Sequence, residues 1–78
     1  MDYRERIVVD PEILVGKPVV RGTRISVALV LRLLALGMEQ ADVLAEYPRL
    51  TSEDIRACLA YAEALVAGEE IFPATPVA

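Results

Sequence analysis

Apolar residues recur at helical spacing through most of the chain and predict three helices. The first runs from Val27 to about Leu36, with Ser26 as its N-cap and Gly37 as the residue that ends it. Its apolar residues form two sides, one with Val27, Val30, Leu31 and Leu34, the other with Leu29, Leu33 and Leu36. A small domain cannot cover both sides of such a helix, so we expect a partner chain to cover one.

The second predicted helix runs from about Glu39 to Glu46 and ends before Pro48. We expect it to turn three residues inward: Val43, Leu44 and Tyr47. Together with the first helix it forms the beginning of a helical unit.

The third predicted helix begins at Thr51-Ser52-Glu53-Asp54, which resembles a capping box with Asp54 in place of Glu or Gln. It extends to about Ala67 and is ended by Gly68. The apolar residues at helical spacing are Ile55, Cys58, Leu59, Ala62, Leu65 and Val66. We expect this face to pack inward.

Two short runs typical of strands precede the helices, Arg6 to Val9 and Val19 to Arg21. Pro11 ends the first run because proline has no N–H for a strand ladder. Glu12 to Val15 forms either one helical turn or a loop. The runs therefore predict a small antiparallel ribbon.

These elements predict a mainly α fold, in which a short N-terminal β-ribbon precedes a three-helix, helix-turn-helix-like bundle. Residues 1–72 form a single domain, and residues 73–78 are expected to be a mobile tail.

Size and composition predict association. The chain has 78 residues, of which 55% are hydrophobic, and a chain this short buries only about 60% of its unfolded surface. Its single cysteine cannot form an intramolecular disulfide, and without histidine a Cys/His zinc site is excluded. A partner chain remains as the means of stabilisation. We expect a homodimer, with Leu29, Leu33 and Leu36 at the interface.

Basic residues gather in one stretch although the net charge is −4. The stretch Gly16 to Arg24 holds three of the eight basic residues, Lys17, Arg21 and Arg24. With Thr23 as a further hydrogen-bond donor, they are the candidate residues for contact with an anionic partner. The alternative is a turn whose cations are simply solvated.

An enzyme is not expected. Pro11 and Pro18 stand where a phosphate-binding P-loop requires Gly and Ser or Thr. Cys58 lies on an apolar helix face, and no histidine is present to activate it. No metal site or cofactor is predicted, nor a segment long enough to span a membrane, and we expect a cytoplasmic protein.

DNA binding through the helices is disfavoured by their acids. Helix-turn-helix proteins place a cationic or amide-rich helix in the major groove. Here the second helix carries Glu39, Asp42 and Glu46, and the third opens with Glu53 and Asp54. Since carboxylates repel phosphates, the basic ribbon, doubled in a dimer, is the better DNA contact.

Several motifs closely resemble domain-of-unknown-function family 433. They are Asp10-Pro11, the stretch from Gly16 to Ile25 that reads GKPVVRGTRI, Gly37, Tyr47-Pro48-Arg49-Leu50-Thr51, Asp54-Ile55 and Ala60-Tyr61-Ala62. The similarity covers roughly Ile7 to Tyr61.

The resemblance implies a homeodomain-like helix-turn-helix fold and a VapB-type antitoxin that neutralises a PIN-like ribonuclease and represses its own promoter. Such toxins cut RNA with metal-binding carboxylates. The guanidinium of Arg21 or Arg24, inserted among these carboxylates, would pair with them and compete with the metal. Lys17, Arg21, Thr23 and Arg24 are thus candidate contacts to nucleic acid or toxin. The alternatives are a stand-alone DNA-binding regulator and a dimeric interaction module that binds no nucleic acid.

Overall fold

The N-terminal ribbon is present and antiparallel. In the computed structural model, which describes residues 2–68, β1 (Ile7–Val9) pairs with β2 (Pro18–Val20), and Val8 lies opposite Val19. Short 3₁₀ turns precede each strand, η1 (Tyr3–Glu5) and η2 (Leu14–Gly16). The predicted ribbon is therefore confirmed. The segment between the strands contains η2, in which Leu14, Val15 and Gly16 all have positive φ, so it is a left-handed turn of the loop and not a turn of right-handed helix.

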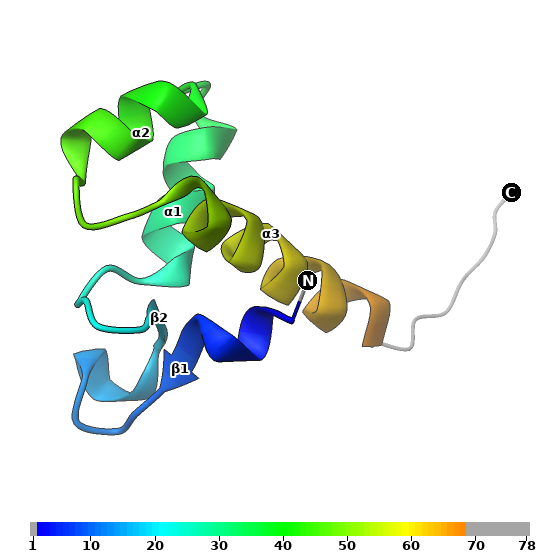
Figure 1. The fold of residues 1–78 in the computed structure, drawn as a ribbon. Coiled ribbons are helices and arrows are strands. Elements are labelled where there is room, and N and C mark those ends of the chain that lie inside the picture. The colour runs from blue at the N-terminus through cyan, green and yellow to red at the C-terminus, as the bar shows by residue number, and fades with distance from the viewer. Residues whose placement is uncertain (1, 69–78) are drawn as a thin grey trace, which may run out of the picture.

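Three helices follow the ribbon: α1 (Val27–Ala35), α2 (Gln40–Glu46) and α3 (Ser52–Gly68). Figure 1 shows α1 and α2 stacked on one side of the molecule and α3 crossing in front of α1, with η1 and the ribbon below α3. The described residues are mainly helical with a two-stranded sheet. No helix among them combines the length and apolar composition needed to cross a membrane.

The predicted caps of α1 are confirmed, whereas Gly68, predicted to end α3, is still part of that helix. Ser26 Oγ accepts a hydrogen bond from the Leu29 N–H at 3.0 Å, and α1 ends one residue before the C-cap Leu36. Gly37 follows with a φ of +99°, the left-handed conformation that glycine adopts without strain. Local side-chain chemistry thus sets both ends of α1.

A reciprocal capping box starts α3. The Thr51 N–H donates to Asp54 Oδ2 at 2.9 Å, and the Asp54 N–H donates to Thr51 Oγ1 at 3.2 Å. Asp54 therefore takes the role that Glu or Gln has in the usual motif.

The core lies where α1, α2 and the first half of α3 meet the ribbon. Its fully buried side chains share β-branched or compact shapes: Val19, Val20, Val30, Val43, Ile55 and Cys58. Leu44 and Tyr47 are half-buried against this core, so the inward face predicted for α2 is confirmed.

The second half of α3 differs from its prediction. Ile55 and Cys58 are fully buried, but Leu59, Leu65 and Val66 are exposed. Leu59 adjoins fully buried Cys58 and therefore lies off the core-facing side of α3. Leu65 and Val66 lie near the end of the helix, where α3 continues past the described body of the protein (Figure 1). Apolar periodicity gives the face that a helix would bury, but not how far the partner surface extends.

The second side of α1 is only partly free. Leu33 packs against the core of its own chain and Leu29 is half-buried, whereas Leu36 is 76% exposed. Of the three predicted interface residues, Leu36 is thus the most accessible. The predicted tail, residues 73–78, lies outside the described residues.

Candidate functional site

A tight turn joins β2 to α1 and carries the two candidate arginines; we call residues 21–24 the cationic turn. The Thr23 N–H donates to the Val20 carbonyl at 3.0 Å, and Gly22 has a φ of +80°. A positive φ at the third position is what a type II turn requires, which explains glycine there. The turn displays exposed Arg21 and Arg24 on either side of Gly22 and Thr23.

Thr23 stabilises this turn from within. Its Oγ1 donates to the Val20 carbonyl at 2.8 Å and accepts the Ile25 N–H at 2.9 Å. Both hydrogen-bonding functions of the hydroxyl are used locally. Thr23 therefore shapes the turn in this structure, although it was predicted as a contact residue.

Arg21 is held by backbone carbonyls. Its Nε donates to the Glu5 carbonyl at 2.8 Å and its Nη2 to the Arg4 carbonyl at 3.4 Å. Within residues 2–68 its guanidinium has no ion-pair partner. Two neutral acceptors orient the group without neutralising its charge, which leaves the Nη1 end for an anion.

Arg49 adds a third cation to this region, although it was not among the contact residues predicted from the sequence. Its Nη2 donates to the Gly22 carbonyl at 2.8 Å across 27 residues of sequence. This places the link between α2 and α3 beside the cationic turn. The residues around Arg49 in the sequence do not indicate which carbonyl it contacts, so this contact could not be predicted from a local motif.

Lys17 is not part of this group. It precedes β2, whereas the cationic turn follows it, so the strand separates them by roughly 13 Å at about 3.3 Å per residue. The structure therefore brings Arg21, Arg24 and Arg49 to one end of β2 and leaves Lys17 at the other.

A polar depression of about 330 Å³ lies beside Arg21 and is lined by Glu5, Arg6, Arg21 and Asp54. Arg6 Nη1 donates to Asp54 Oδ1 at 3.0 Å, and the Asp54 side chain is 10% exposed. With its other oxygen on the Thr51 N–H, Asp54 is occupied on both sides. Its charge is met by Arg6, and Arg21 remains the unpaired cation of this depression among the described residues.

The environment of Cys58 does not favour a nucleophilic thiol. Burial, with the nearby Asp54 charge as a lesser cause, raises the pKa of the Cys58 thiol to about 11. The thiol is thus protonated at neutral pH, when only a thiolate would attack. Within residues 2–68 no group of three or more His, Cys, Asp or Glu side chains is placed to hold a metal ion.

Comparison with known proteins gives one consistent result. Residues 7–62 match the model of the family described as "Protein of unknown function (DUF433)". The uncharacterized protein y4eO of Sinorhizobium fredii (strain NBRC 101917 / NGR234) is 44% identical over 61 residues, which are 78% of this chain and 28% of that protein. This chain thus spans about a quarter of that relative's length.

The fold is also similar to a solved structure, the crystal structure of a DUF433 member protein from Anabaena variabilis ATCC 29413. The two share 32% sequence identity and superpose with a TM-score of 0.75. The similarity covers 80% of this chain and 61% of the other.

Proposed function

The chain belongs to the DUF433 family, and from that premise we propose that it is the antitoxin of a type II toxin–antitoxin pair. In this proposal the protein is not an enzyme: it binds and inhibits a PIN-like ribonuclease. The cationic turn makes the contact, with Arg21 directed at the metal-binding carboxylates of the toxin.

The guanidinium of Arg21, which is oriented and has no ion-pair partner among residues 2–68, carries this proposal. A guanidinium forms bidentate hydrogen bonds with a carboxylate, and these are among the strongest that proteins make. Because the Glu5 and Arg4 carbonyls already hold Arg21, little side-chain entropy is lost when an anion binds. Exposed Arg24 and the neighbouring Arg49 add positive potential around the same point.

Inhibition of the ribonuclease tests the proposal. The chain is titrated into the PIN-like ribonuclease that this proposal assigns as its partner, and RNA cleavage is measured. Loss of a buried, hydrogen-bonded charge pair costs at least about 2 kcal/mol, so we expect Arg21→Ala to weaken inhibition by roughly 30-fold or more. Arg21→Lys keeps the charge but loses the planar fork, and should recover only part of the inhibition.

Lys17→Ala is the matched control, because it removes a cation of the same stretch at the far end of β2. It should inhibit as well as the unmodified chain. Full neutralisation by a chain carrying both Arg21→Ala and Arg24→Ala would show that the proposal is wrong.

A second candidate function, autorepression by DNA binding, is favoured by the position of Asp54. This carboxylate opens α3, but it is buried and paired with Arg6. Only Glu53 of the two acids at the start of α3 is exposed, beside exposed Arg49 and Arg56. The repulsion that acids at this helix end would exert on phosphates is thereby reduced.

In this second function α2 and α3 act as a helix-turn-helix-like unit, and a homodimer doubles the cationic turn. A salt titration of binding to promoter DNA tests it. Affinity should fall steeply with salt, and each phosphate contact removed by Arg24→Ala or Arg49→Ala should reduce the slope of log K against log salt by about 0.9. Affinity that does not change with salt would support a regulator or module that makes no phosphate contact.

A further inference from the structure

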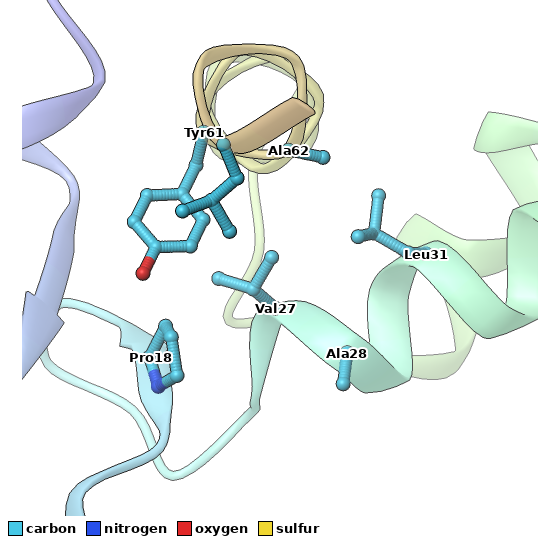
Figure 2. Close-up of a pocket in the computed structure, with 7 residues that line it drawn as sticks. Pro18, Val27, Ala28, Leu31, Tyr61 and Ala62 are labelled. Carbon is cyan, nitrogen blue, oxygen red and sulfur yellow. The ribbon is translucent and has the colours of Figure 1, made fainter. Parts of the chain in front are cut away.

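An apolar groove of about 180 Å³ lies between β2, α1 and the second half of α3. It is lined by Pro18, Val27, Ala28, Leu31, Tyr61, Ala62 and Leu65, none of which carries a charge at neutral pH. Figure 2 shows the ring of Tyr61 above Val27, with its hydroxyl toward Pro18. The groove lies apart from the cationic turn and belongs to none of the contacts described above.

The core-facing side of α3 continues along this groove, where no residue of the described part of the chain covers it. Leu65 follows Cys58 by seven residues, which is two helical turns, so both residues lie on one side of α3. Cys58 is fully buried and Leu65 is 59% exposed. An apolar side chain on the core-facing side is thus left open at the end of the described chain.

We propose that the groove is the docking site of Ile71 and Phe72 of the same chain, with the Phe72 ring against Tyr61. These two are the first large apolar residues after Gly68, and Phe72 is the only phenylalanine of the sequence. Apolar cavities of about 150 Å³ bind benzene, so a groove of about 180 Å³ has the size of a phenyl ring.

The length of the connection suits this occupant. Phe72 follows Gly68 by four positions, and an extended chain spans up to about 13–14 Å over four residues. Leu65 and Tyr61 precede Gly68 by three and seven residues, or roughly 4.5 and 10 Å along the helix axis. A connection of this length is therefore long enough for Phe72 to reach back to Tyr61.

Covalent attachment favours the same chain over a second copy. A segment tethered by a short linker has an effective concentration in the millimolar range, far above the micromolar concentration of a second molecule. Glu69 and Glu70 also disfavour continuation of α3, because negative charge at a helix C-terminus opposes the helix dipole.

Fluorescence of a full chain carrying Phe72→Trp tests the docking, since the sequence contains no other tryptophan. We expect indole emission blue-shifted relative to the denatured protein and unchanged on dilution through the micromolar range. Adding Ala28→Glu, which places a carboxylate on an exposed groove residue, should shift the emission to the red. Ala35→Glu, exposed on the same helix but outside the groove, is the matched control and should leave it unchanged.

A second measurement avoids the Phe72→Trp substitution, which replaces the phenyl ring by a larger indole. Ile71→Ser combined with Phe72→Ser in the full chain should speed amide exchange in the last turn of α3 several-fold, with no change around Val30. Emission equal to that of the denatured protein, or unaffected by Ala28→Glu, overturns the proposal. A blue shift that disappears on dilution also overturns it, because a second copy would then be the occupant.

Discussion

Arg6 and Asp54 form an ion pair with an Nη1–Oδ1 distance of 3.0 Å that joins the start of β1 to the first turn of α3. The residues are 48 positions apart in sequence. Since the second oxygen of Asp54 accepts the Thr51 N–H, one carboxylate caps the helix and also fixes the ribbon against it. The pair thereby sets the position of the depression beside Arg21.

Asp54→Ala should lower the free energy of unfolding by roughly 1–3 kcal/mol, because it removes a helix cap and leaves Arg6 without its partner. Asp54→Asn keeps an acceptor for the Thr51 N–H and should cost less. Urea unfolding measures both. Glu53→Gln, the exposed neighbour, should stay within about 0.5 kcal/mol of the unmodified chain. Equal stabilities of the Asp54→Ala and Glu53→Gln chains would contradict the structural role of the pair.

Stability should fall as the pH rises from about 9 to about 11. The thiol of Cys58 has an ordinary pKa of 9.0, which the fold raises to about 11. Over this window the unfolded chain releases a proton that the folded chain retains, so alkali favours unfolding, by roughly 2 kcal/mol in all. Thermal unfolding against pH in the unmodified and Cys58→Ala chains measures the difference. Parallel pH profiles for the two chains would rule out this contribution.

Val15→Asn should stabilise the protein by roughly 0.5–1 kcal/mol. Val15 has a φ of +57° and is 91% exposed, so a β-branched residue adopts a strained left-handed conformation with little burial in return. Asparagine tolerates this conformation better. Val9→Asn, at an exposed strand position, is the control and should not stabilise. Chemical denaturation distinguishes the two, and a Val15→Asn chain less stable than the unmodified one would refute the strain argument.

The proposed homodimer should depend on the outer side of α1. Leu36→Glu places a charge on the most exposed of the predicted interface residues and should shift sedimentation at micromolar concentration towards the monomer. Ala35→Glu adds the same charge at the adjacent exposed position and serves as the control. A chain that sediments as a monomer without any substitution would show that this interface does not form.

Sequence reasoning succeeded where the determining interactions are local. Ser26, Gly37 and the Thr51–Asp54 box each act within a few residues, and the structure confirms all of them. The two short runs of β-branched residues likewise identified the ribbon, and the helical spacing of apolar residues identified the helices. These signals do not depend on how the elements pack.

The candidate site was predicted only in part, because its arrangement depends on contacts between distant residues. The sequence pointed to the cationic turn, but not to Arg49, which approaches it across 27 residues, nor to the Arg6 partner of Asp54. Thr23 and Lys17 were grouped with the arginines by proximity in sequence. In the structure, the three residues of β2 separate Lys17 from the arginines. The hydroxyl of Thr23 is hydrogen-bonded within its own turn, to the Val20 carbonyl.

The pairing of Arg6 with Asp54 also has a consequence for synthesis. A ribosome releases the N-terminal ribbon well before the residues of α3, so the ribbon emerges without its carboxylate partner and without the helix that Tyr3 contacts through Tyr61. Two strands of three residues are not stable alone in water. The nascent chain must therefore leave its ribbon without this support until α3 emerges, and residues 2–68 complete their fold only after that point.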